Sequence, residues 1–196
     1  MKLFKKVLAI AMASALALTL LVGCGKDNGK TTFTIVDYMN DWAAVQGGDI
    51  VYKADTALDT NAKNVVTVLQ STNAKTFEEL YKTMGNVYQN ENSELWKALV
   101  KATTGSDTKN FYEIGVTMID QKLVTDAAKD SVGMYQAQMM QSTIKDVYTP
   151  DGLKDDHGYI SGSKLENTTY VGTATMSLGG KSYLIAVFRT AGKAAK

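Results

Sequence analysis

The feature that most constrains the fold is a continuous apolar run, SYLIAVF, at residues 182–188. It follows Gly179-Gly180. Before the glycines, one alternate set of positions holds Tyr170, Gly172, Ala174, Met176 and Leu178, and the other holds Val171, Thr173, Thr175 and Ser177. Glycine accepts the positive φ that a two-residue hairpin turn requires. A strand that is apolar on both sides is covered on both faces of its sheet. The pattern predicts a C-terminal antiparallel hairpin whose second strand is the most buried of the domain.

The same stretch contains Gly180-Lys181-Ser182, which is how a phosphate-binding loop ends. Such a loop needs another glycine five positions before its Gly-Lys pair and a helix after it. Thr175 occupies that position, and a strand is expected to follow. The hairpin is therefore the favoured interpretation, and no nucleotide site is expected.

The part of the chain before the hairpin reads mainly as helices. Apolar residues recur with helical spacing from Ile35 and again from Leu58, where Asp55 or Thr56 is a candidate cap. Thr76 to Glu79 form a capping-box pattern. Helices are predicted over about 35–47, 58–69, 76–84, 93–104, 108–123 and 125–148, with Ser93 as a cap, Gly105 as a stop, and Ala128, Val132, Tyr135 and Met139 on one face of the last. The Met-rich segment 134–140 favours core packing over an adaptable groove.

After Pro150, residues 151–169 are polar, glycine-containing and aperiodic, so a long loop is expected between the helices and the hairpin. Helices followed by a sheet indicate an α+β domain. We expect one such domain over residues 34–190, followed by a polar tail, 191–196.

The first 23 residues have the layout of a secretory signal. Three lysines precede an apolar run over 7–22, and Leu21-Val22-Gly23 before Cys24 resembles the lipobox of bacterial lipoproteins. This resemblance implies acyl chains on Cys24, a polar tether at 24–33, and an extracytoplasmic domain anchored to the bacterial cell membrane. An ordinary signal peptide or an uncleaved anchor with an incidental cysteine is the alternative.

Composition narrows the classes of function. Cys24 is the only cysteine, so an intrachain disulfide and a cysteine-based metal site are both impossible. Without the three lysines of the leader, 18 basic side chains stand against 20 acidic ones, a net charge of −2. That balance argues against nucleic acid as a partner. No sequence pattern calls for a cofactor or a metal, and no GxSxG segment is present.

One short segment is a candidate ligand loop. His157 is the only histidine, and Asp155, Asp156 and Tyr159 lie beside it. The acidic spacing does not match the alternating ligands of a calcium loop. A solvated acidic loop is the simpler interpretation, and a weak ion or ligand site at Asp155, Asp156, His157 and Tyr159 is the functional one.

Two segments together resemble the CAP/SCP-like domain (cysteine-rich secretory proteins, antigen 5, pathogenesis-related 1). In residues 35–69, Asn40, Gly47, Leu58 and Ala62 stand where bacterial members carry their motif residues, although Ala43 replaces the usual arginine. In YVGTATMSLGGKSYLIAVF, at 170–188, Val171, Gly172 and Phe188 match the closing hairpin of the family.

The resemblance implies an α-β-α sandwich with a groove near residues 150–165. The family site has two histidines and two glutamates, one of them in a GEN segment. Here no GEN occurs, and His157 alone lies near a family histidine position. The chain would then be a divergent member without the intact tetrad.

Three functions remain open at this point. The leading hypothesis is a non-catalytic surface lipoprotein that binds a small ligand, a lipid or another surface protein. A hydrolase would need convergent carboxylates, and the candidates are Glu78, Glu79, Glu113, Asp155 and Asp156. A structural component of the envelope would show a large exposed apolar patch instead.

Overall fold

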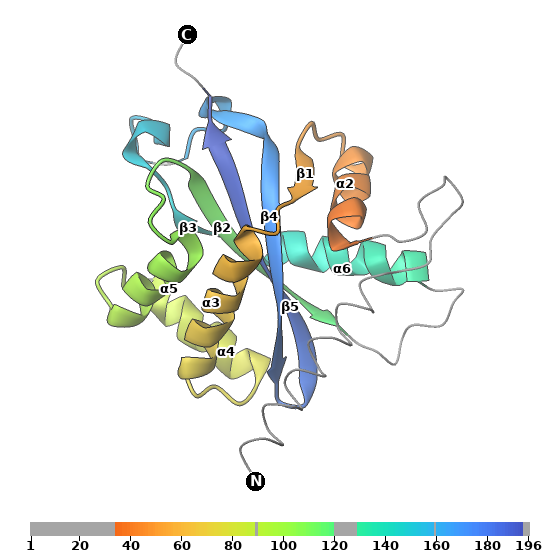
Figure 1. Ribbon diagram of the computed structural model, residues 1–196, viewed down its shortest axis with the longest axis vertical. Coiled ribbons are helices and arrows are strands. Elements are labelled where there is room, and N and C mark those ends of the chain that lie inside the picture. The colour runs from red at the N-terminus through yellow and green to blue at the C-terminus, as the bar shows by residue number, and fades with distance from the viewer. Residues whose placement is uncertain (1–33, 89, 120–128, 159, 194–196) are drawn as a thin grey trace.

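The computed structural model describes residues 34–88, 90–119, 129–158 and 160–193 (Figure 1). Within these ranges the chain forms a mixed α+β fold with five α-helices and a five-stranded sheet. The helices are α2 (Ile35–Val45), α3 (Leu58–Ser71), α4 (Phe77–Tyr88), α5 (Glu94–Thr104) and α6 (Lys129–Thr143). The strands are β1 (Val51–Ala54), β2 (Phe111–Ile119), β3 (Lys145–Tyr148), β4 (Leu165–Leu178) and β5 (Lys181–Gly192).

The predicted hairpin is present and forms the centre of the sheet. The strand order is β1-β4-β5-β2-β3, in which β1 runs parallel to β4 and the other pairs are antiparallel. Gly179 and Gly180 make the turn with φ values of 59° and 74°. Positive φ at both positions is what a type I′ turn requires, which explains the two glycines.

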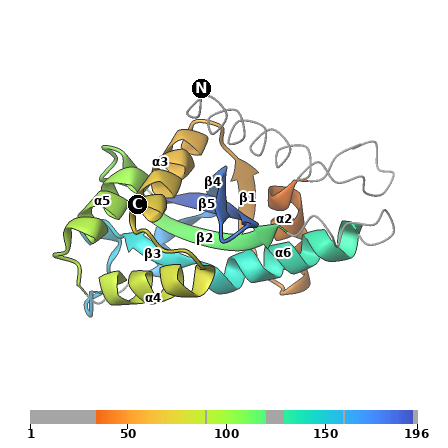
Figure 2. The ribbon, with the colours of Figure 1, turned by 90° about the horizontal axis from the view of Figure 1, so that it is seen from below.

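Helices cover both faces of the sheet. In Figure 2, α3 and α5 lie on one side of it, and α2 and α6 lie on the other. Leu80 of α4 packs in the same apolar cluster as α3 and α5. Each side has its own apolar cluster, and β5 contributes to both. Tyr183, Ile185 and Val187 pack toward α3 and its neighbours, whereas Leu184 and Phe188 pack toward α2 and α6. The expectation that this strand is covered on both faces is confirmed.

Several helix boundaries follow from caps that the sequence shows. The Ser93 side chain accepts a hydrogen bond from the Trp96 amide at 3.1 Å at the start of α5, and Gly105 ends that helix with a φ of 64°. Neither predicted cap residue serves α3, because its N-cap is Ala57 and no side chain caps it. The Asp55 side chain instead accepts from the amide of Ala57 itself, the residue just before the helix, at 2.9 Å.

One predicted helix is wrong, and a second is confirmed over only part of its length. The helix expected over 108–123 is strand β2, which pairs with β5 from Phe111 through Ile119. The helix expected over 125–148 is confirmed as α6 over Lys129–Thr143, but its expected end, Lys145–Tyr148, is strand β3. In β2, buried side chains lie on both faces, and tertiary pairing with the central strand overrides the weak helical spacing.

The face predicted for the last helix is also wrong. Tyr135 and Met139 are 58% and 38% exposed, whereas Ala137 and Met140 are fully buried. Gly133 packs against Tyr38, where an added Cβ would lie 2.3 Å from the ring. Because α2 approaches α6 closely at Gly133, the face of α6 that carries Gly133, Ala137 and Met140 is the buried one. Of the other predicted positions, Ala128 and the side chain of Val132 lie outside the described residues.

The segment predicted as a long loop is partly ordered secondary structure. Two 3-10 turns, Asp151–Leu153 and Gly162–Lys164, occupy it, and β4 begins at Leu165. At the other end of the hairpin, β5 continues to Gly192, beyond the expected limit at residue 190.

The open edge of β1 is closed by a side chain. Asn40 on α2 donates its amide Nδ2 to the carbonyl of Tyr52 at 2.9 Å, and its Oδ1 accepts from the Tyr52 amide at 2.7 Å. The side chain thus replaces the main chain of a further strand. Such capping protects an edge from pairing with another chain.

We expect Asn40→Ala to lower the free energy of unfolding by about 1–2 kcal/mol, because it leaves two partly buried main-chain groups without partners. Urea unfolding measures the change. Asn64→Ala on the exposed face of α3 is the matched control and should be close to neutral. Equal effects of the two substitutions would contradict this role of Asn40.

Candidate functional site

An open pocket of about 850 Å³ lies between α5 and β3. One wall comes from α5 and the residues around it, 91–108, and the other comes from β3 and the segment after it, 146–160. We call it the α5–β3 pocket. Its volume falls within the range of small-ligand sites, roughly 300–1,000 Å³.

The helical wall follows from the register of α5. Trp96, Val100 and Thr104 are four residues apart, and Lys97 and Lys101 lie one residue further on, so all five lie along one side of the helix. The Ser93 cap sets where the helix begins and therefore which residues face the pocket.

The pocket carries both signs of charge. Lys97 forms an ion pair with Glu94 at 2.9 Å, and Lys154 pairs with Asp151 at 2.7 Å on the opposite wall. The hydrogen bond from Lys154 lowers the pKa of Asp151. Lys101 makes no ion pair with any residue in the described ranges, so it remains available to a ligand.

A hydrogen-bonded carboxylate stands at one end of the pocket. Asp107 accepts from the Tyr112 hydroxyl at 2.9 Å, from the Asn110 side-chain amide, and from the Lys109 amide at 2.8 Å. Desolvation opposes ionisation of Asp107, but these hydrogen bonds, led by that of Asn110, outweigh it and lower its pKa. Burial and the hydrogen bond to Asp107 raise the pKa of Tyr112 to about 12. The Asp107 carboxylate is therefore an anion that its hydrogen bonds hold in place at the pocket.

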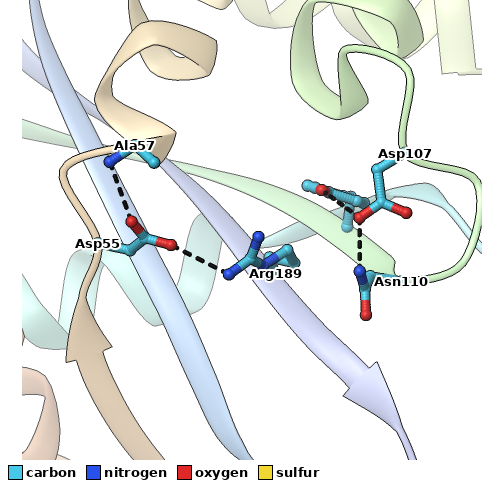
Figure 3. Close-up of polar contacts among 6 residues, drawn as sticks. Asp55, Ala57, Asp107, Asn110 and Arg189 are labelled. Atoms are coloured by element: carbon cyan, nitrogen blue, oxygen red, sulfur yellow. Dashed lines mark hydrogen bonds and ion pairs between the residues drawn. The ribbon is translucent and has the colours of Figure 1, made fainter.

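The only arginine of the chain lies beside this cluster, as Figure 3 shows. Arg189 on β5 stands between Tyr170 and Tyr112 on the neighbouring strands, and its guanidinium carbon lies 5.1 Å from the centre of the Tyr170 ring. Arg189 also forms an ion pair with the Asp55 carboxylate at 3.0 Å. The same carboxylate accepts a hydrogen bond from the Ala57 amide. The arrangement ties the start of α3 to the central strand, which is a structural role.

One carboxyl group has strongly altered acidity. Glu113 on β2 lies opposite Phe188 and therefore on the face covered by α2 and α6. Burial, with a smaller effect of Asp146 across the strand pair, raises its pKa to about 7. Burial and the charge of Glu113 also raise the pKa of Tyr52, whose hydroxyl accepts from Gln141 at 3.0 Å.

The carboxylates proposed for a hydrolase lie on three separate segments. Glu78 and Glu79 are exposed on α4, where Glu78 pairs with Lys82 and Glu79 accepts from the Lys75 amide. Asp155 and Asp156 are exposed in the segment after β3. The carboxylate that acts on Glu113 is Asp146, which is not one of the other four candidates.

The predicted ligand loop forms a tight exposed turn next to the pocket. Asp155 accepts from the amides of His157 at 2.9 Å and Gly158 at 3.0 Å. Lys154, Gly158 and Ile160 line the pocket, whereas Asp155, Asp156 and His157 do not. Tyr159 and Cys24 lie outside the described residues. Within the described ranges, no group of three or more potential metal-ligating side chains comes together.

The pocket residues Trp96, Lys101 and Tyr148 were not singled out from the sequence. The four-residue spacing of Lys97 and Lys101 beside Trp96 was the available signal, since it places all three on one side of a helix. Tyr148 gave no such signal, because the sequence predicts a helix over 125–148 and therefore no edge strand at this position.

In the part of the chain that is described, no helix has the length and apolar character of a membrane span. Comparison with known proteins adds no further constraint: no family model, no curated protein and no solved structure matches the chain.

Proposed function

We propose that this chain is a lipoprotein anchored outside the cytoplasm to the bacterial cell membrane, and that its folded domain is a non-catalytic binding module. The ligand occupies the α5–β3 pocket. The observation that carries the proposal is the pocket itself, which is open, of ligand size, and lined by aromatic, charged and amide side chains from two segments.

We further propose that the domain is a divergent CAP-like domain. The two segments that carry the resemblance share one core, which supports this. Leu58 and Gly172, both motif positions, are in direct contact, and Val171 and Phe188 pack in the cluster beneath α2. The arrangement with β5 central and helices on both faces is the one that the resemblance implies.

The lipid anchor is tested by labelling. Cells that express the full-length chain are fed an alkyne fatty acid, and the labelled protein is detected after coupling to a dye. Label that is present in the parent and absent from Cys24→Ser supports the anchor. Equal labelling of both would place the lipid elsewhere, and no labelling of either would refute it.

The binding function is tested by NMR with the full-length protein in detergent. A fragment set of sugars, amino acids and dipeptides is added to isotope-labelled protein. We expect amide shifts to concentrate at 91–108 and 146–160, and to disappear in Lys101→Tyr, which fills the pocket from an exposed position. Lys63→Tyr on the exposed side of α3 is the control. Shifts elsewhere, or no shifts, would refute the pocket as the binding site.

A carboxylate-dependent hydrolase is the second candidate, and the raised pKa of Glu113 is the observation that favours it, since a general acid needs such a value. Glu113 does not line the α5–β3 pocket, which is why binding ranks first. Hydrolysis of chromogenic esters or glycosides that is present in the parent and lost in Glu113→Gln would reverse this order.

A structural role in the envelope is the third candidate. The large apolar side chains that are exposed in the described residues are distributed over α2, the connection after it, β1, α4, β2 and α6. Such a distribution gives less support to a structural surface than one contiguous patch would.

A further inference from the structure

The two edges of the sheet are treated differently. At one edge, Asn40 occupies the main-chain groups of Tyr52 and closes β1. At the other edge, β3 pairs with β2 on one side only, and Asp146 to Thr149 line the α5–β3 pocket. The unclosed edge is therefore also the one that borders a cavity.

The main chain on this edge is available for pairing. Apart from the ladder to β2, no main-chain hydrogen bond joins Val147, Tyr148 or Thr149 to another residue in the described ranges. Along a strand, successive main-chain groups point to opposite edges. Donors and acceptors of this short stretch therefore face the pocket, where a ligand can replace water as their partner.

From these observations we propose that the ligand is an extended polypeptide segment that adds to β3 as a further strand and lies against α5. This inference rests on the proposed binding function of the pocket. An edge strand faced by a helix is a recurring geometry for peptide recognition, in which main-chain hydrogen bonds provide affinity and side-chain contacts provide selectivity.

The side chains of the pocket suit a peptide of mixed character. Val100 on the helix and Val147 and Ile160 opposite offer apolar contacts. Lys101, which has no ion pair with a described residue, suits an acidic side chain or a carboxyl terminus, and Asp107 suits a donor. A small polar molecule such as a sugar could use the same side chains, but it would not use the open edge of β3.

The probe is a library of random decapeptides displayed on phage and selected on the purified full-length protein. The tightest peptide is then synthesised in three forms: unmodified, and with alternate backbone nitrogens methylated in two complementary frames. Methylation removes the N–H and leaves the side chains unchanged. In one frame the N–H groups that face β3 are lost, and in the other those that face away.

We expect at least about a tenfold loss of affinity in one frame, since two or more hydrogen bonds are removed, and little change in the other. The unmodified peptide should also slow amide exchange at Val147 or Tyr148. It should bind Lys63→Tyr as it binds the parent, and bind Lys101→Tyr at least about tenfold more weakly.

Equal affinity in both frames would overturn the inference, and so would a library that yields no peptide sensitive to Lys101→Tyr. The proposed binding function of the pocket is tested separately from strand addition. If fragments such as sugars shift the pocket amides while peptides do not, strand addition is wrong and the pocket remains a binding site. If neither binds there, both proposals fail.

Discussion

Replacing Gly172 by alanine is expected to lower the free energy of unfolding by about 3 kcal/mol or more, at the upper end of the effects of overpacking. A Cβ at this position would lie 2.2 Å from the carbonyl carbon of Leu58 and 2.5 Å from its oxygen. These are main-chain atoms of the first turn of α3, so no side-chain rotation relieves the overlap. The helix would have to move away from β4.

That movement would break further contacts at the same place. The Asp55 amide donates to the Val171 carbonyl at 2.9 Å, and the Asp59 carboxylate accepts from the Thr173 amide at 2.8 Å. Both bonds hold the start of α3 on β4, and Gly172 lies between them. The substitution therefore strains the junction between β1, α3 and the central hairpin.

Urea unfolding followed by circular dichroism measures this effect. The matched control is Gly152→Ala, where no atom lies within 4 Å of the added Cβ. That substitution should be neutral or stabilise by up to about 1 kcal/mol, because alanine restricts the unfolded chain. A loss below about 1 kcal/mol for Gly172→Ala would show that α3 shifts easily, contrary to the packing described.

The parts of the fold that could be predicted from sequence are those with a local signal. The hairpin at Gly179-Gly180 needs positive φ, and that requirement is visible in the residues themselves. The buried stripe of α3, from Leu58 to Leu69, repeats at helical spacing, and Ser93 and Gly105 mark both ends of α5. In each case, residues that are close together in the sequence determine the local structure.

Strands β2 and β3 could not be predicted because their cause is distant in sequence. Phe111–Ile119 becomes a strand by pairing with β5, about seventy residues later in the chain. Helices are expected over 108–123 and 125–148 because apolar residues there recur at helical spacing. That spacing carries no information about pairing with β5. Long-range pairing of this kind decides strand identity more than local preference does.

The pocket has the same origin. Lys101 and Tyr148 line one pocket only because β3 lies at the sheet edge beside α5. The sequence pointed instead to Asp155, Asp156 and His157, since charged residues and the only histidine gather there. Those side chains lie on an exposed turn close to the pocket, so the predicted region was near the site while the predicted residues were not in its lining.

Stability should fall as the pH rises from about 5 to 8, and Glu113 should be the main cause. Burial raises the pKa of this carboxyl from 4.5 to about 7. Between these values the folded protein binds a proton that the unfolded chain does not. The stabilisation is therefore fully present below pH 4.5 and is lost as the pH rises through about 7, with an upper limit of about 3 kcal/mol.

Glu113→Gln isolates this contribution, because glutamine resembles the neutral acid at every pH. At pH 5 the variant and the parent should unfold at similar urea concentrations. At pH 8 the variant should be more stable, by up to about 3 kcal/mol, since it avoids a buried charge near Asp146 and Tyr52.

Glu166→Gln is the matched control, because Glu166 is exposed on β4. Its urea midpoints should follow those of the parent from pH 5 to 8. If the curves of Glu113→Gln and the parent ran parallel over this range, Glu113 would have to be ionised without cost in the folded state. Its carboxylate would then be reached by water or by a donor, and Glu113 would not hold a proton near neutral pH.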